Sequence, residues 1–405
     1  MFIIAVNCAT YPVAIECPLE AMERQKAWRR NLVVSNSRAV TRESVLEALG
    51  AVQDPELHRD LVSLGMVDDI EIEGSTVSFT IVLTTPACPL KRQIESSARE
   101  AVMAIPGVEQ VRINVSSRVP TGRARTKEMI PGVRNVIAIG SGKGGVGKST
   151  VAVGIALALA ESGARVGLLD ADIWGPNIPQ MLGIQSPPRT EGKKLLPALG
   201  HGVKTISMDF FVDETTPIVW RGPMVGKMVE QFLSDVEWGE LDYLVVDLPP
   251  GTGDASLTLA QTIPLTGMVV VATPQDVALA DAVKALAMFR RLEVPILGIV
   301  ENMSYFICPH CNERTDIFGH GGARGMAEEL GVPFLGEIPI DPVIRAGGDV
   351  GQPVLVIDPK SPLSQAFREM AGLLAARISV EGLKGEPDQE PGVEFVTPRG
   401  RQQGA

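Results

Sequence analysis

Residues 140–150 have the sequence GSGKGGVGKST, and this glycine-rich stretch is the strongest indication of the fold. It follows an apolar run, NVIAIG at 135–140, and precedes an apolar sequence with helical spacing. Residues 142–149 fit the pattern G-x-x-x-x-G-K-[ST] without a mismatch. Glycines let backbone N–H groups surround phosphate oxygens, and the N-terminus of the following helix favours negative charge. The stretch therefore predicts a phosphate-binding loop between a buried strand and a helix, as in P-loop nucleotide hydrolases.

The chemistry of this loop predicts a site for ATP and Mg²⁺. We expect Lys148 to meet the β and γ phosphates and the hydroxyl of Ser149 to bind Mg²⁺. The segment VVDLPPGTGD at 245–254 supplies Asp247 as an outer partner of the Mg²⁺ and the N–H of Gly251 for the γ-phosphate. The expected phosphate-binding residues of the loop are Gly142, Lys143, Gly144, Gly145, Val146, Gly147, Lys148, Ser149 and Thr150.

A dinucleotide site is the competing interpretation of the same glycines. Gly142, Gly144 and Gly147 also satisfy G-x-G-x-x-G, and Asp170 ends the next apolar run. A pyrophosphate needs neither the Lys148–Ser149 pair nor a second lysine in the loop, and 245–254 provides a separate acidic strand end. We therefore prefer the nucleotide hydrolase.

Apolar runs alternate with helical patterns outward from this loop, across residues 135–380. Strands this uniformly apolar are buried on both faces, which predicts an α/β domain with a parallel sheet wrapped by helices. Helices are expected at 149–162, 276–292 and 323–330, and the site is expected at the carboxyl ends of the strands. The runs lie at 135–140, 165–170, 243–250, 267–274, 295–303 and 333–339.

A small α+β domain is expected ahead of this one, at residues 41–116. Thr41 caps a helical pattern, two alternating segments meet at a turn at Gly74 and Ser75, and an amphipathic helix and a last strand follow. The polar segment 117–134 is typical of a linker. We expect residues 1–40 to be a poorly structured leader and residues 381–405 a disordered tail.

Composition excludes several classes of protein. The 405 residues carry a net charge of −11, which argues against a nucleic-acid partner, since such proteins normally present a basic face. No apolar run reaches 18 residues, so we expect no membrane partner. Five cysteines, scattered except for one close pair, are typical of a reducing cytoplasm and not of a disulfide framework.

The close pair is Cys308 and Cys311, within ENMSYFICPHCNERTDIFGHGG at 301–322. Two thiols supply half of the four ligands that zinc or an iron–sulfur cluster takes. A two-fold homodimer would bring two pairs together around one cluster. The rival interpretation is a one-chain zinc site that begins with both cysteines and His320, although its fourth ligand is not obvious.

The loop KGGVGKST at 143–150 resembles the deviant phosphate loop of the ATPases that partition DNA, place division sites and reduce nitrogenase. In that group the first lysine crosses a dimer interface, so the resemblance implies that Lys143 acts on the partner's nucleotide. Asp170 and Asp172 then lie in the first switch loop, where Asp172 is our candidate to orient the attacking water and Asp170 could instead support Mg²⁺. One of the two could be only a helix cap. Asn302 resembles the adenine-contacting asparagine of the group.

The chain further resembles the Mrp/ApbC family of iron–sulfur cluster carriers. The resemblance lies in DADIWGPNIPQMLG at 170–183, DLPPGTGD at 247–254, ATPQDVALAD at 272–281 and the segment 301–322. The small domain, with VQDPELHRDLVSLGMV and TTPACP, is similar to a domain of the same assembly pathway. The resemblance implies a [4Fe–4S] cluster held between two subunits, slow ATP hydrolysis, and transfer of the cluster to apoproteins.

Several alternatives stay open at this point. Cys88 is either a transient ligand or docking contact, with its pKa lowered by a helix start, or a half-buried residue of no special role. Asp54 and Glu56 are better explained by a turn than by a site. As a whole, the chain could instead be a partitioning or positioning ATPase with structural zinc at the cysteines. A nitrogenase-type reductase is disfavoured because its cluster cysteines lie far apart in sequence.

Overall fold

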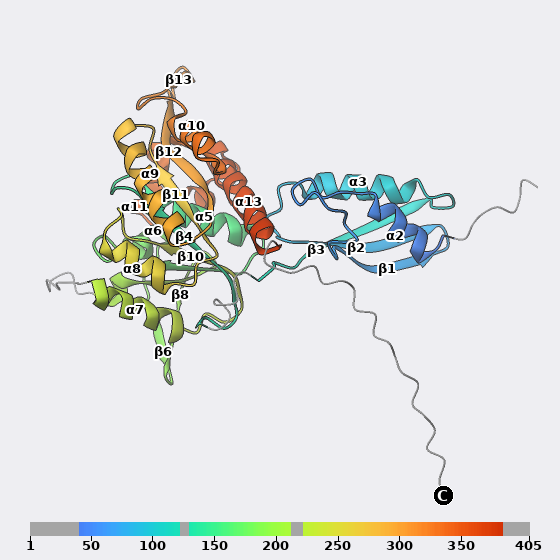
Figure 1. Ribbon diagram of the computed structural model, residues 1–405, viewed down its shortest axis with the longest axis horizontal. Helices are drawn as coiled ribbons and strands as arrows, with labels where there is room; N and C mark the ends of the chain where they lie inside the picture. Colours follow the sequence, from blue (N-terminus) through green and yellow to red (C-terminus); the bar gives the residue numbers. More distant parts are fainter. Residues whose placement is uncertain (1–39, 122–128, 212–221, 384–405) are drawn as a thin grey trace, which may run out of the picture.

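The computed structural model describes residues 40–121, 129–211 and 222–383, and it contains a small three-stranded unit beside a larger nine-stranded one (Figure 1). The leader expected at 1–40, apart from Val40, lies outside the described residues. So do residues 122–128 of the expected linker and 384–405 of the expected tail.

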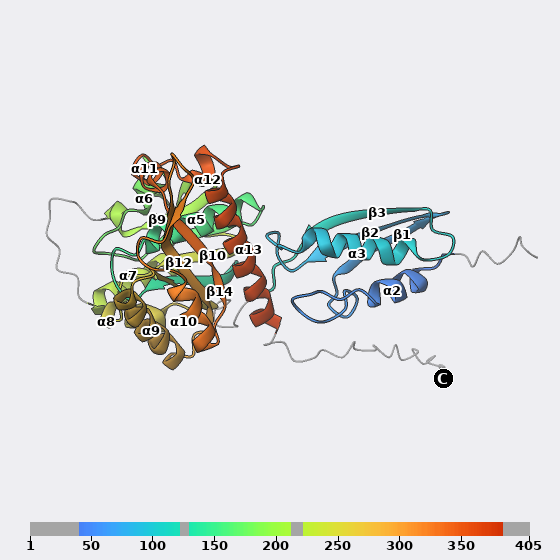
Figure 2. The same ribbon diagram turned by 90° about the horizontal axis from the view of Figure 1, so that it is seen from above.

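The small unit is built as its sequence pattern predicts. Thr41 caps the first helix, since its hydroxyl accepts the N–H of Ser44 at 3.3 Å. The first two strands pair antiparallel with Glu73 opposite Thr76, and the second and third strands pair in parallel. Two helices cover one face of this sheet (Figure 2). The elements are α2 (Arg42–Gly50), β1 (Val67–Glu73), β2 (Thr76–Leu83), α3 (Lys91–Met103) and β3 (Gln110–Ser117).

The larger unit contains the predicted parallel sheet. Seven strands pair in parallel, in the order β9, β5, β10, β4, β11, β12 and β14, and β8 and β13 add antiparallel pairs at its two sides. The strands are β4 (Val133–Ser141), β5 (Val166–Asp170), β8 (Ala198–Gly200), β9 (Val203–Ser207), β10 (Leu241–Asp247), β11 (Gly267–Ala272), β12 (Ile296–Ile307), β13 (Arg314–Thr315) and β14 (Phe334–Ile340).

Helices cover both faces of this sheet, which is why the strands are uniformly apolar. In β4, Ile137 and Ile139 pack toward α5 and α13, whereas Val136 and Ala138 pack toward the helices of the opposite face. On the first face lie α5 (Lys148–Glu161) and α13 (Pro362–Leu383), with the short α6 (Ile178–Met181), α11 (Pro342–Asp349) and α12 (Val354–Ile357). On the other lie α7 (Gly222–Ser234), α8 (Asp254–Thr262), α9 (Asp276–Arg291) and α10 (Gly322–Leu330).

The remaining short elements are a hairpin of β6 (Arg189–Glu191) and β7 (Lys194–Leu196), which projects from the larger unit, and the 3₁₀ turn η1 (Met208–Phe211). Among the helices of the described ranges, none combines the length and the apolar character that a membrane crossing requires.

The small unit docks where the parallel strands begin, next to α13 (Figures 1 and 2). The buried hydroxyl of Tyr243, near the start of β10, donates to the Thr85 hydroxyl at 3.0 Å. Ala87 packs against the core under α13, where a side chain on Gly372 would lie 3.0 Å from the Ala87 carbonyl oxygen. The glycine-rich loop lies at the opposite ends of these strands. The length of the strands therefore separates this loop from the docked small unit.

Asp242, in β10, links the starts of neighbouring strands through Arg134 in β4 and Arg165 just before β5. Asp242 lies 3.1 Å from Arg134 and 3.0 Å from Arg165, and it accepts the backbone N–H of Arg165 at 2.9 Å. Burial alone would raise the pKa of Asp242, but the hydrogen bonds of Arg165 and the charges of both guanidinium groups hold it below its usual value. The cluster therefore favours the charged form of Asp242.

Candidate nucleotide site and cysteine hairpin

The glycine-rich loop connects β4 to α5 in a path that only glycine permits. A side chain at Gly142 would lie 2.3 Å from the carbonyl oxygen of Asp281, so the loop passes directly against the backbone of α9. Gly147 is the N-cap of α5 with φ of 81°, and a Cβ there would lie 2.1 Å from Asn302 Nδ2. Gly147 is thus held at the start of α5, where the sequence predicts that backbone N–H groups meet a phosphate.

A buried lysine lies at the centre of the site. Lys148 Nζ lies 2.7 Å from Asp247 Oδ1 and 3.4 Å from Asp172 Oδ2. The hydroxyl of Ser149 donates to Asp247 Oδ2 at 2.5 Å. Neighbouring strand ends bring these groups together, since Asp170 at the end of β5 lies opposite Asp247 at the end of β10. The structure therefore assembles Lys148, Ser149, Asp172 and Asp247, all four predicted from sequence.

The surroundings of Asp247 suit a divalent cation. The side chain is fully buried, and burial raises its pKa despite the positive charge of Lys148. Its Oδ1 faces Lys148 Nζ at 2.7 Å and its Oδ2 accepts the Ser149 hydroxyl, so both carboxylate oxygens point at the groups that a bound nucleotide would meet. A hydroxyl and a carboxylate held side by side are oxygen ligands of the kind that Mg²⁺ takes. Ser149 and Asp247 thus fit the predicted Mg²⁺ and would hold it directly or through water.

The first switch loop is organised by Asp170. Its carboxylate accepts the Ser207 hydroxyl at 2.9 Å and the N–H groups of Asp172 at 3.2 Å and Ile178 at 3.4 Å. Burial, followed by the nearby charge of Asp247, raises the pKa of Asp170 to about 7. Because Ile178 begins α6, Asp170 fits the capping alternative, and Asp172 is left facing Lys148.

Two other predicted residues lie at the rim of the site. The side chain of Lys143 is partly exposed, and no carboxylate within the described ranges forms an ion pair with it. The Gly251 N–H donates to the carbonyl of Ser141 at 2.9 Å. A phosphate contact from Gly251 would therefore require exchange of that hydrogen bond.

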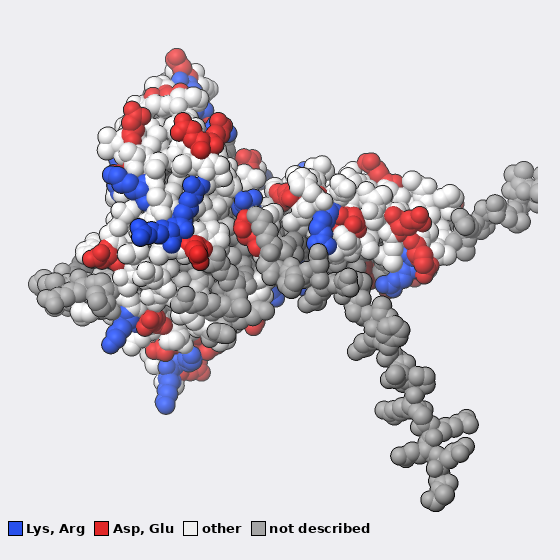
Figure 3. Space-filling view, in the orientation of Figure 1, with Lys and Arg blue, Asp and Glu red and all other residues white. Residues whose placement is uncertain are grey.

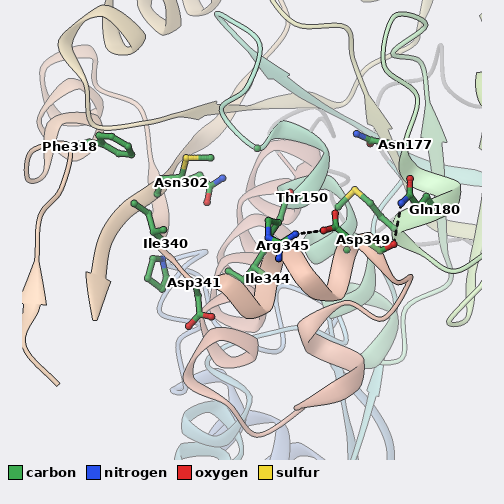
Figure 4. A pocket seen from close by; sticks show the side chains of 15 residues that line it. Thr150, Asn177, Gln180, Asn302, Phe318, Ile340, Asp341, Ile344, Arg345 and Asp349 are labelled. Atoms are coloured by element: carbon green, nitrogen blue, oxygen red, sulfur yellow. Dashed lines mark hydrogen bonds and ion pairs between the residues drawn. The ribbon is translucent and has the colours of Figure 1, made fainter. Parts of the chain in front are cut away.

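A pocket of about 520 Å³ opens beside the loop, between Gly147 and α11 (Figure 4). Asn302 lies in its wall and donates to the Val146 carbonyl at 2.9 Å, so the predicted base-contacting residue also supports the loop. Ligand pockets are commonly of this size and mostly apolar. The other lining residues are Thr150, Asn177, Gln180, Met181, Met303, Phe318, Pro339, Ile340, Asp341, Ile344, Arg345, Gly348 and Asp349.

Most of these lining residues were not among the site residues predicted from the sequence. A signal existed in IPIDPVIRAGGD at 338–349, where an apolar strand ends in Asp341 beside two prolines. In the structure that strand is β14, which pairs with β12 so that Ile338 lies opposite Asn302, and Ile340 and Asp341 line the same pocket. The pairing joins two segments that are distant in the sequence and could not be read from either one alone.

The two cysteines occupy the tip of a hairpin that extends β12 into β13, at the top of the larger unit in Figure 1. The Cys308 N–H donates to the Glu313 carbonyl at 3.0 Å, and the Asn312 N–H donates back to the Cys308 carbonyl at 2.8 Å. Cys311 is exposed and Cys308 half-exposed. Backbone N–H groups of His310 and Cys311, with the Cys311 side chain, lower the pKa of Cys308, which favours the thiolate that binds metal.

The hairpin offers two ligands and not a full set. His320 Nδ1 lies 3.2 Å from both Arg314 and Asp316, so it is already engaged away from the thiols. Over residues 40–121, 129–211 and 222–383, no three side chains of His, Cys, Asp or Glu converge as a metal site. The one-chain zinc alternative therefore lacks its third ligand in this conformation.

Comparisons with known proteins agree with this combination of sites. Residues 132–375 match the family described as NUBPL iron-transfer P-loop NTPase, and residues 42–115 match the family described as iron–sulfur cluster assembly protein. The chain belongs to the iron-transfer P-loop NTPase family. A Deinococcus radiodurans protein named iron–sulfur cluster carrier protein is 51% identical over 86% of this chain and 99% of its own length. A Synechocystis protein of the same name is 50% identical over 85% and 99%.

A solved structure also matches this chain over a length similar to that of the larger unit. It is a nucleotide-binding protein from Archaeoglobus fulgidus in complex with ADP, 40% identical, with a TM-score of 0.52. The match covers 59% of this chain and 94% of that one. The α/β fold with its nucleotide loop is thus that of an ADP-binding protein.

The small unit of this family member keeps its cysteine away from the hairpin. Cys88 lies in the loop that docks beside α13, at the strand starts, whereas Cys308 and Cys311 lie beyond a strand end. Burial raises the pKa of Cys88 to about 11, so the expected lowering by the helix start is wrong. The helix begins only at Lys91, and the thiol is desolvated because Cys88 packs against the core of the small unit itself.

The carboxylates near Cys88 also have a structural explanation. Asp54 Oδ1 accepts the N–H groups of Glu56 at 2.9 Å and Leu57 at 3.0 Å, which is the geometry of a capped turn. Burial and the charge of Asp54 raise the pKa of Glu56. This arrangement supports the turn that the sequence favoured.

Proposed function

We propose that this chain carries iron–sulfur clusters and transfers them to recipient apoproteins, and that it hydrolyses ATP as part of that cycle. The observation that carries the proposal is the course of β12. Its middle residue, Asn302, lines the nucleotide pocket, and its end leads directly to Cys308 and Cys311 on an exposed hairpin. An exposed thiol pair suits a cargo that must be loaded and released, and membership of an iron-transfer family supports the same conclusion.

The cargo we propose is a [4Fe–4S] cluster shared by two copies of the chain. Each copy supplies Cys308 and Cys311, and a two-fold axis near the hairpin tips would bring four thiolates together. The absence of a third ligand near the pair, within the described ranges, motivates the second copy. The position of the hairpin at an outer end of the molecule leaves room for it (Figure 1).

The proposed roles in hydrolysis follow from the geometry around Lys148. Lys148 and the loop N–H groups bind the β and γ phosphates, and Asp172, 3.4 Å from Lys148, orients the attacking water. Mg²⁺, when bound at Ser149 and Asp247, neutralises charge on the phosphates. Lys143 supplies a positive charge to the nucleotide of the partner copy. Asn302 contacts the base while it holds the loop through Val146.

The setting of this activity is also part of the proposal. Cys88, Cys308 and Cys311 are free thiols, which suits a reducing cytoplasm. The net charge of −11 favours protein recipients over nucleic acid or an anionic membrane surface. We propose that residues 41–116 and 135–380 act as distinct domains joined by the linker 117–134.

The alternative, a positioning ATPase with structural zinc, has less support. Zinc would need two further ligands, and His320, the candidate third ligand, is held by Arg314 and Asp316. A positioning ATPase also gives no reason for an exposed thiol pair at the end of a strand that lines the nucleotide pocket.

Anaerobic reconstitution with ferrous iron and sulfide tests the proposal. We expect an absorption band of an iron–sulfur cluster and about four irons per two chains. Cys308→Ala and Cys311→Ala should each abolish the band, whereas Cys88→Ala, the matched control in the same chain, should retain it. Recovery of one tightly held zinc per monomer and no cluster would overturn the proposal.

A further inference from the structure

The cysteine hairpin contacts the nucleotide pocket at both of its ends. At its first end, Met303 lines the pocket next to Asn302. Met303 has φ of 56°, and the pairing of β12 with β14 is irregular between Asn302 and Phe306, so the chain leaves the regular ladder there. At the returning end, Phe318 lines the same pocket. Fourteen residues that include both thiols thus lie between two pocket contacts, at 303 and 318.

The hairpin between these contacts is braced. Phe306 pairs with Thr315 and Ile307 with Arg314, in an antiparallel ladder directly below the thiols. A displacement of the returning strand is therefore transmitted across the ladder to Cys308.

Arg314 adds a second set of contacts across the hairpin. Its guanidinium lies 3.9 Å from the centre of the Tyr305 ring, 3.0 Å from Asp316 and 3.3 Å from Glu337. Glu337 in turn accepts the Ser304 hydroxyl at 3.1 Å. The contacts of Arg314 thus link the two strands of the hairpin to each other, so the hairpin should move as one body. Its contact with Glu337 connects that body to β14.

Phe318 is the member of this hairpin that a nucleotide would touch. Its side chain is 39% exposed, unlike the buried aromatic residues of the core. Figure 4 shows it on the same side of the pocket as Asn302 and Ile340, across from Gln180 and Asp349. An exposed aromatic ring in the wall of a mostly apolar pocket gains contact when a planar base enters.

We propose that Phe318 packs against the base of the bound nucleotide and that this contact couples nucleotide occupancy to the position of Cys308 and Cys311. The inference rests on the proposed function for the role of the two thiols. The nucleotide changes the packing of Phe318, the braced hairpin moves with it, and the thiols at the tip change their exposure. Release of the nucleotide, and with it the base, reverses the change.

The test uses the full-length, metal-free protein and two matched variants. Phe318→Ala removes the ring, and Ile317→Ala removes the neighbouring side chain, which is 50% exposed and does not line the pocket. The first measurement is the affinity for fluorescent ADP. We expect Phe318→Ala to weaken binding about five- to tenfold, the low end of base–aromatic stacking, and Ile317→Ala to leave it unchanged.

The second measurement is the alkylation rate of Cys308 and Cys311, followed by peptide mass spectrometry with and without saturating ADP or ATP. In the parent protein we expect nucleotide to change this rate about fivefold or more. The change should be lost in Phe318→Ala even at saturation and kept in Ile317→Ala. Circular dichroism confirms that both variants are folded.

The proposal is overturned if Phe318→Ala binds ADP normally or keeps the full nucleotide effect on alkylation. These measurements need no cluster, so failure of cluster reconstitution would contradict the proposed function and leave the coupling standing. Conversely, a protein that loads a cluster but shows no dependence on Phe318 would keep the function and lose the coupling.

Discussion

Lys148 and Asp247 form a buried ion pair, with 2.7 Å between Nζ and Oδ1, in a place where Asp247 has no contact with water. The pair holds Lys148 Nζ where the phosphates of a nucleotide would lie. A bound phosphate could then replace Asp247 as the negative partner of the lysine. A buried charge without its partner is unfavourable, so each residue constrains the other.

Lys148→Ala should therefore abolish hydrolysis without unfolding the chain. Loss of the lysine leaves the Asp247 carboxylate buried, and its already raised pKa should rise further until it binds a proton. We expect ATP hydrolysis to fall about a hundredfold or more. Phosphate release measures the loss, and circular dichroism checks the fold. Unchanged hydrolysis would contradict the assignment of the loop.

Lys143→Ala tests action across a dimer interface. Alone, this variant should bind ADP and lose hydrolysis, because it keeps Lys148 and the loop glycines but lacks the lysine that its partner copy would supply. Mixing Lys143→Ala with Lys148→Ala in equal amounts should restore about a quarter of the parent activity, since half of the dimers then contain one complete site. Without any recovery on mixing, a role of Lys143 in trans is wrong.

Asp242 predicts a specific dependence of stability on pH. Its pKa is lowered in the folded chain, so its stabilising contribution is present above the unfolded value, about 4, and is lost as the pH falls through the folded value. Asp242→Asn should lower the free energy of unfolding by about 1–2 kcal/mol at pH 7. Denaturant titrations should show this difference shrinking below about pH 4. Glu191→Gln, on the exposed hairpin, is the control and should show no such difference.

Tyr243→Phe tests the docking of the small unit. Burial raises the pKa of Tyr243, so the hydroxyl stays protonated and donates to Thr85 throughout the neutral range. Removing it should cost about 1 kcal/mol and increase cleavage within residues 117–134 during limited proteolysis. An unaltered cleavage rate would mean that this hydrogen bond does not hold the two units together.

Of the three cysteines that the structure describes, Cys88 should be the slowest to react in the metal-free protein. With a pKa of about 11 it is about 0.1% thiolate at pH 8, whereas Cys308 has its pKa lowered. Iodoacetamide should modify Cys308 first, and the rate at Cys88 should rise about tenfold per pH unit up to pH 10. Urea should remove the difference. Equal rates in the folded protein would contradict the docked position of Cys88.

The sequence was informative wherever a local pattern determines the structure. The loop at 140–150 predicted the N-terminus of α5, Thr41 predicted the cap of α2, and the apolar runs predicted the parallel strands, because each depends on neighbouring residues alone. Lys148, Ser149, Asp172 and Asp247 were likewise predicted, since parallel strands place their carboxyl ends at one edge.

What the sequence could not show depends on contacts between distant segments. Phe318 and Asp341 enter the pocket only because β14 pairs with β12 and the hairpin turns back. Cys88 loses its predicted low pKa because it packs against the core of the small unit, near the carboxylates of Glu56 and Asp54 more than 30 positions earlier. The short strand β8 and the β6–β7 hairpin carry polar, exposed residues and give no apolar signal.

The docking of Thr85 on Tyr243 has a consequence for the shape of any assembly. A pair of chains joined at their hairpin tips would leave both small units clear of the joint, because each docks at the strand starts whereas the hairpin continues from a strand end. A recipient could then reach the joined tips without displacing either small unit.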